Sequence, residues 1–185
     1  MRLLPFALLL TACAATHSAS PPPSLPPSAG ALIPAVELRT LDGKPARLDE
    51  IAHGRPALVS LWATWCEACT REFDALARLD EAARGAGATV IAIAVGEPHA
   101  LVQRFVQRRA LPYAQLVDER FQLADAIGQS RVPATLVLGR DGRVGYRGGA
   151  FDESALAAFR AALAAKPAGG GDVTPSTGRL DHAAR

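Results

Sequence analysis

The chain has 185 residues, of which 20 are basic and 18 acidic, so its formal net charge is only +2. A charge this close to balance argues against nucleic acid as a partner, because domains that bind nucleic acid carry a clear excess of positive side chains. No apolar run approaches the roughly 20 residues that a helix needs to cross a bilayer. Length, composition and charge therefore favour one compact domain that does not span a membrane.

The first residues have the pattern of a secretory signal. Met1 and Arg2 supply one positive charge, and residues 3–10 form a short, mostly apolar run. The sequence Leu-Thr-Ala-Cys at residues 10–13 resembles the bacterial lipobox, in which the signal is cut before the cysteine and the sulfur is acylated. This resemblance predicts a signal peptide over residues 1–12 and a lipid on Cys13. The alternative is a chance cysteine beside an ordinary cleavage site.

Two further segments have compositions that are poorly suited to forming a core. Residues 13–34 are rich in Ser, Ala and Pro, which predicts an extended tether. Residues 167–185 contain three consecutive glycines and no helical or strand period, which predicts a flexible tail. We therefore expect a single domain over residues 35–166.

The domain is predicted to begin with a β-hairpin and a buried strand. Residues 35–40 alternate in polarity and are followed by an Asp-Gly turn and a second short strand over residues 45–48. Residues 57–63 are almost continuously apolar, the pattern of a strand covered on both faces. We expect this run to be a central, parallel strand.

The rest of the domain alternates between helical and extended patterns. A helix is predicted from Cys66 to the glycines near residue 85, because its apolar positions follow helical spacing. Further strands are predicted at residues 89–95, 113–117, 134–138 and 144–147, and further helices at residues 99–109, 121–127 and from Asp152, the expected N-cap. This order predicts an α/β fold in which helices flank a central mixed sheet.

The pair Cys66 and Cys69 lies where the buried strand is followed by the helix. At a helix N-terminus, unpaired backbone N–H groups and the helix dipole favour the thiolate of Cys66. Cys69 lies three residues further on the same helix face and can close a short disulfide with it. Cys66 is therefore predicted to attack a substrate disulfide and Cys69 to resolve the mixed disulfide, leaving the pair oxidised.

Two other interpretations of this cysteine pair are weaker. A structural disulfide stabilises mainly by closing a long loop, whereas this loop is very short. Tetrahedral zinc would need further Cys or His ligands, and the four histidines have no ligand-like spacing. We therefore expect neither a metal nor a cofactor.

Several motifs together carry a family resemblance: Leu-Trp-Ala-Thr-Trp-Cys-Glu-Ala-Cys at residues 61–69, Arg-Glu-Phe at 71–73, Val-Pro-Ala-Thr at 132–135 and Asp-Gly at 141–142. They resemble the thioredoxin-like, membrane-tethered disulfide reductases of bacteria, the TlpA/ResA-like group that includes cytochrome c maturation factors. The resemblance covers about residues 35–165. It implies a thioredoxin-like fold with an N-terminal hairpin and an inserted helix–strand unit at residues 99–117.

The resemblance also implies roles for individual residues. Pro133 is expected to be a cis-proline facing the disulfide, with the Val132 backbone binding substrate, although an ordinary trans-proline is the alternative. Glu72 matches an active-site glutamate that could shuttle protons, or it is a solvated acid in the helix's first turns. Trp65 is expected to shield the disulfide and offer an apolar surface to substrate, with simple packing as the alternative.

Three positions depart from the family pattern. Ala68 occupies a position between the cysteines that is often proline, and Arg131 one that is often glycine. Ser60 stands where cytoplasmic thioredoxins have a buried aspartate, so their proton-handling carboxylate is missing. Both Ala68 and Arg131 are expected at the active face.

The leading hypothesis is a protein-disulfide reductase that acts on exported proteins, with apocytochrome cysteines as one option. We expect a monomer that is lipid-anchored on the periplasmic side through Cys13 and re-reduced by an inner-membrane thiol donor. An oxidase or isomerase is the closest rival because Ala68 changes the dipeptide that helps set the potential. A thiol peroxidase is disfavoured because Ala63 stands where that class has threonine. A non-enzymatic haem or copper chaperone is the remaining alternative.

Overall fold

The computed structural model describes residues 30–165 of the chain. The predicted signal peptide, Cys13, most of the tether and the tail lie outside these residues. The elements in chain order are β1 (Glu37–Thr40), β2 (Pro45–Arg47), α1 (Leu48–Ile51), β3 (Ala57–Trp62), α2 (Glu67–Gly85), β4 (Thr89–Val95), α3 (His99–Arg109), β5 (Ala114–Asp118), α4 (Gln122–Ala126), β6 (Ala134–Leu138), β7 (Val144–Gly148) and α5 (Glu153–Ala164). Within residues 30–165, no helix has the length and apolar character that crossing a membrane requires.

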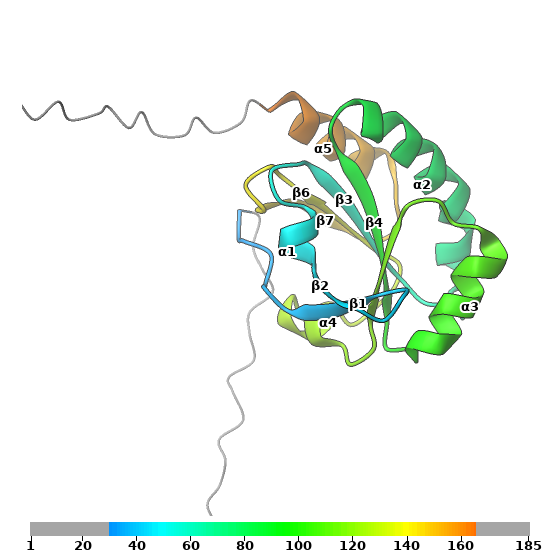
Figure 1. Ribbon diagram of the computed structural model, residues 1–185. Helices are drawn as coiled ribbons and strands as arrows, with labels where there is room; N and C mark the ends of the chain where they lie inside the picture. The colour runs from blue at the N-terminus through cyan, green and yellow to red at the C-terminus, as the bar shows by residue number, and fades with distance from the viewer. Residues whose placement is uncertain (1–29, 166–185) are drawn as a thin grey trace, which may run out of the picture.

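Seven strands form one mixed sheet in the order β2-β1-β5-β4-β3-β6-β7 (Figure 1). Strands β3, β4 and β5 are parallel, whereas the pairings of β1 with β2 and β5, and of β6 with β3 and β7, are antiparallel. The predicted mixed α/β fold is confirmed. The expectation of a parallel central strand holds on one side of β3 only, because its other neighbour, β6, runs antiparallel.

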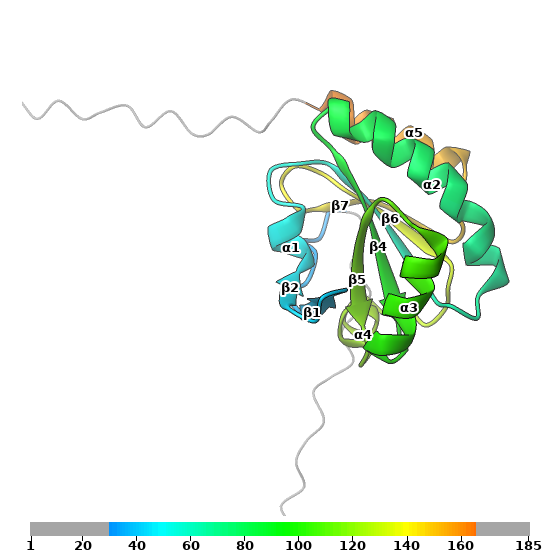
Figure 2. The same ribbon diagram turned by 45° about the vertical axis from the view of Figure 1, so that its right-hand side comes forward.

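Helices cover both faces of this sheet, as the two views in Figures 1 and 2 show. Side chains from α1 and α4 share one core cluster with Val59 and Leu61 of β3. Side chains from α2, α3 and α5 share the other with Leu58 and Trp62. Consecutive residues of a strand point to opposite faces, and helices cover both faces of this sheet, so every residue of β3 is buried and all but Ser60 are apolar.

One edge of the sheet collects the segments that build the site. The register pairs Trp62 of β3 with Ala94 of β4, and Leu61 with Ala134 at the start of β6. The parallel strands β3 and β4 therefore end, and the antiparallel strand β6 begins, at the same edge. The chain segments after β3, after β4 and before β6 consequently meet there, although they lie far apart in sequence.

The predicted tether needs a correction at its C-terminal end. Residues 30–34 were assigned to it, but Leu32 forms an antiparallel bridge with Arg143, and the Ile33 amide donates to the Gly142 carbonyl at 3.0 Å. Ile33 is buried in the core. These residues therefore belong to the domain. Helix α1 was not predicted, because a helix of four residues is too short to show a periodic pattern.

Candidate active site: a disulfide at a helix N-terminus

A tight turn joins β3 to α2. The Cys66 amide donates to the Ala63 carbonyl at 3.1 Å, which closes a four-residue turn with Thr64 and Trp65 at its centre. Cys66 then adopts an extended conformation as the N-cap of α2. Its sulfur accepts a hydrogen bond from the Cys69 amide at 3.1 Å, so the cysteine side chain itself caps the helix.

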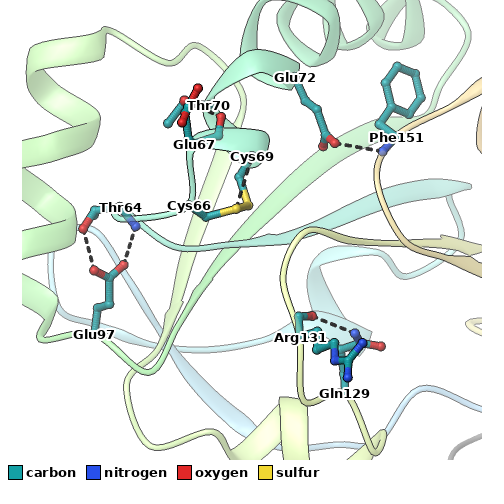
Figure 3. Close-up of a disulfide and its surroundings, with 10 residues drawn as sticks. All are labelled: Thr64, Cys66, Glu67, Cys69, Thr70, Glu72, Glu97, Gln129, Arg131 and Phe151. Carbon is teal, nitrogen blue, oxygen red and sulfur yellow. Dashed lines mark hydrogen bonds between the residues drawn. A yellow bond between two sulfur atoms is a disulfide. The ribbon is translucent and has the colours of Figure 1, made fainter.

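Cys66 and Cys69 are joined by a disulfide with a Cα–Cα distance of 5.3 Å (Figure 3). The two cysteines differ in position, since Cys66 precedes the helix and Cys69 lies within its first turn. The free N–H groups of the first turn and the positive end of the helix dipole favour a thiolate on Cys66. Both cysteines are buried, with 5% of Cys66 and 1% of Cys69 exposed. The difference between them therefore lies in their position relative to the first turn of α2 and not in burial.

The Val132–Pro133 peptide bond is cis, as the resemblance predicts. Pro133 immediately precedes β6 and therefore lies at the same sheet edge as the turn before Cys66. A groove of about 240 Å³ lies at this edge, lined by Trp65, Val95, Phe121, Ser130, Arg131 and Val132. The structure thus brings Trp65 and Val132 together, two of the residues predicted to bind substrate.

Trp65 has 72% of its surface exposed. This exposure excludes simple packing as its role, since a buried tryptophan would gain far more from the hydrophobic effect. Trp62, by contrast, is fully buried and packs edge-on against Phe73 of α2, with ring centroids 5.2 Å apart. The chain thus buries one tryptophan beneath the site and exposes the other beside it.

Glu72 lies one turn after Cys69 and is partly buried. One carboxylate oxygen accepts a hydrogen bond from the Phe151 amide at 3.1 Å, and the other is buried without a partner among residues 30–165 (Figure 3). Burial, the largest cause, raises the pKa of Glu72, while the Phe151 amide and the charge of Arg71 partly oppose the rise. Glu72 is therefore not the fully solvated acid that was its alternative interpretation.

Two residues of the site were not predicted from the sequence. Glu97 follows β4 and is almost fully buried, and its carboxylate accepts hydrogen bonds from the amide and the hydroxyl of Thr64. Phe121 has a positive φ of 59° and is 48% exposed. Its ring lies against Gly96, where an added Cβ would approach the ring to 2.0 Å, so this position requires glycine. An acid two residues after a buried parallel strand was the only local signal that could have indicated Glu97.

The three departures from the family pattern lie in different parts of the domain. Arg131 is exposed and lines the groove, and Ala68 lies between the two cysteines within α2. Ser60 is buried within β3, with Thr135 of β6 as its antiparallel neighbour. The position at which cytoplasmic thioredoxins have a buried aspartate is therefore a buried serine in this chain.

The sheet, the cis-proline and the helix-capping disulfide together define a thioredoxin-like domain. A model of the AhpC/TSA family matches residues 29–147, which is well over half of the chain. The chain belongs to the AhpC/TSA family.

Curated relatives are similar over the same region. The thiol-disulfide oxidoreductase ResA of Geobacillus thermodenitrificans is 30% identical over 115 residues, which cover 62% of this chain and 66% of that protein. ResA of Bacillus subtilis is 28% identical over 117 residues, 63% and 65% of the two chains. The chain thus spans just under two thirds of the length of these relatives.

Solved structures show the same fold. A thiol:disulfide interchange protein of the thioredoxin family from Chlorobium tepidum TLS aligns with a TM-score of 0.62 at 22% identity, covering 74% of this chain and 98% of that one. A thiol:disulfide interchange protein from Bacteroides sp. aligns with a TM-score of 0.66 at 16% identity, covering 76% and 94%. At these identities the likeness establishes the thioredoxin-like fold alone.

The raised pKa of Glu72 predicts a pH-dependent stability. The folded state holds the Glu72 proton to a higher pH than the unfolded chain does, so this contribution to stability is present below the ordinary glutamate value of 4.5 and is lost as pH rises through the folded pKa. The free energy of unfolding of the wild type should therefore fall relative to that of Glu72→Gln between about pH 4 and pH 7. Urea denaturation at both pH values measures this difference, and a difference that does not change with pH would contradict it.

Proposed function

We propose that the chain is a thiol-disulfide oxidoreductase that reduces disulfides of exported proteins. The observation that carries this proposal is the Cys66–Cys69 disulfide, which caps α2 beside the exposed Trp65 and the groove at Val132. A structural disulfide would not need a solvent-exposed tryptophan and a groove beside it. The names of the ResA relatives support the same activity.

The reaction proceeds by two thiol–disulfide exchanges. In the reduced pair, the Cys66 thiolate attacks a substrate disulfide, a mixed disulfide forms, and the first substrate sulfur leaves as a thiolate. Cys69 then loses its proton and attacks the Cys66 sulfur, which releases the second substrate thiolate. The substrate gains two electrons, and the Cys66–Cys69 disulfide seen in the structure is the oxidised product.

Glu72 is the proposed acceptor for the Cys69 proton. It lies one turn beyond Cys69 on the same helix and has a raised pKa, so its affinity for a proton is closer to that of a thiol. Its side chain bonds the Phe151 amide rather than either cysteine. The transfer therefore runs through water or needs a small movement of the side chain.

Substrate binding is assigned to Trp65, Val132 and Pro133. An extended segment that carries the substrate cysteine would lie along the groove, with its backbone bonded to Val132 in the manner of an added strand. Trp65 supplies apolar contact area beside the disulfide. Backbone hydrogen bonds do not depend on the side chains of the bound segment. The site would therefore accept substrate segments of different sequence.

We further propose that the domain acts on the periplasmic side of a bacterial membrane, attached through a lipid on Cys13. An inner-membrane thiol donor would restore the reduced pair, and cysteines of exported proteins, including those used in cytochrome c maturation, would be its substrates. Two observations support this assignment. A short apolar run precedes Cys13, and the proposed redox chemistry uses Cys66 and Cys69 but not Cys13.

The anchor and the active site are separate segments, so they can be tested separately. Cys13→Ala should move the protein from the membrane fraction to the supernatant and leave its reduction of insulin disulfides unchanged, because residue 13 lies outside the domain that carries Cys66. Fractionation followed by an insulin turbidity assay measures both properties. A Cys13→Ala variant that stays with the membranes would remove the lipid anchor from this account.

The two cysteines of the pair should behave differently when each is left alone. In a Cys13→Ala background, Cys69→Ser should accumulate a covalent adduct with substrate because no thiol resolves it. Cys66→Ser should form little adduct and react slowly with iodoacetamide at neutral pH, because the remaining thiol lies inside the first turn of α2 and not at its N-cap. Equal alkylation of the two variants at about pH 6 would refute the assignment of Cys66 as the attacking thiol.

A further inference from the structure

Glu97 is a buried acid with no role in the exchange described above. It follows Gly96 at the end of β4 and precedes Pro98, the N-cap residue of α3. Only 6% of its surface is exposed. A buried carboxylate loses its hydration, so it persists only where other groups replace that hydration.

Thr64 supplies two hydrogen-bond donors to the Glu97 carboxylate. The Thr64 amide donates to Glu97 Oε2 at 2.6 Å, and the Thr64 hydroxyl donates to Glu97 Oε1 at 2.5 Å (Figure 3). The ion pairs among residues 30–165 include none to Glu97. Charge-assisted hydrogen bonds of this kind are stronger than those between neutral groups.

Thr64 occupies the turn that sets the position of the disulfide. The Cys66 amide closes this turn on the Ala63 carbonyl, and the turn places Cys66 at the N-cap and Trp65 in solvent. Both donors of Thr64 bind Glu97, which lies two residues beyond the end of the neighbouring strand β4. Glu97 therefore holds the turn in place at this edge of the sheet through two buried hydrogen bonds.

We propose that Glu97 is a positioning residue for the Cys66–Cys69 pair. By holding Thr64 it keeps the Cys66 sulfur at the N-terminus of α2 after the disulfide has been reduced, when no covalent bond to Cys69 holds it there. The thiolate then keeps the hydrogen bond from the Cys69 amide and the favourable end of the helix dipole. This inference rests on the proposed redox role of the pair.

Two substitutions of Glu97 separate its hydrogen bonds from its charge. Glu97→Gln can keep both contacts, because the amide oxygen accepts from the Thr64 N–H and the amide nitrogen donates to the Thr64 hydroxyl, which can also act as an acceptor. Glu97→Ala loses both contacts. Thr64→Ser keeps both donors, whereas Thr64→Val loses the hydroxyl alone.

The test is the rate of Cys66 alkylation by iodoacetamide against pH in the reduced protein, in a Cys13→Ala background. Glu97→Ala should move the profile to higher pH and slow alkylation at neutral pH by about five-fold, because the freed turn lets the sulfur leave the N-cap. Glu97→Gln, which loses only the negative charge, should match the wild type or lie at lower pH. Thr64→Ser should match the wild type, and Thr64→Val should shift in the direction of Glu97→Ala.

A matched control tests whether any lost buried carboxylate has the same effect. Asp118 ends the neighbouring strand β5, is 1% exposed and accepts from the amides of Gln122, Leu123 and Ala124, so Asp118→Ala should reduce stability without moving the alkylation profile.

A wild-type profile in Glu97→Ala, or equal shifts in Glu97→Ala and Glu97→Gln, would overturn the proposal. If Glu97→Ala does not fold, an unshifted profile in Thr64→Val overturns it instead. Alkylation needs no protein substrate, so a failure of the wild type to reduce insulin bears on the proposed function and not on Glu97.

Discussion

The hydrogen bond from the Cys69 amide to the Cys66 sulfur is the interaction on which the site depends. It makes a cysteine the N-cap of α2, in place of the oxygen-bearing side chains that usually satisfy a helix's first amides. A thiolate accepts such a hydrogen bond better than a neutral thiol does, so the start of the helix favours the nucleophilic form of Cys66. The strands and turns around this helix end keep the Cys66 sulfur at the N-cap of α2.

The sheet achieves this by bringing three segments to one edge. The segment after β3 supplies the turn before Cys66, the segment after β4 supplies Glu97, and the residues before β6 supply Val132 and the cis-proline. These segments lie far apart in the chain, yet the register of three central strands fixes them relative to one another. The site is thus built on rigid strands and a helix end, which is what preorganised chemistry requires.

Much of this arrangement could be predicted because local patterns carry it. The elements at residues 89–95, 99–109 and 134–138 agree with their predictions residue for residue, since an apolar run or a helical period extends through each of them. The features that escaped prediction depend on distant partners. Ile33 lies in a Pro-rich segment, and its amide donates to the carbonyl of Gly142, more than 100 residues later. Glu97 has its partner, Thr64, 33 positions earlier in the chain. Neither contact leaves a periodic signal in the sequence.

The reduction potential of the Cys66–Cys69 pair tests the central claim most directly. We would equilibrate the Cys13→Ala protein with glutathione and dithiothreitol buffers of known potential and quantify the fraction reduced by thiol trapping. A reductase should have a midpoint near that of thioredoxin, at about −270 mV or lower, so that electrons pass readily to substrate disulfides. A midpoint near about −120 mV would mark an oxidant, and a disulfide that excess dithiothreitol cannot open would mark a structural bridge. Either result would contradict the account.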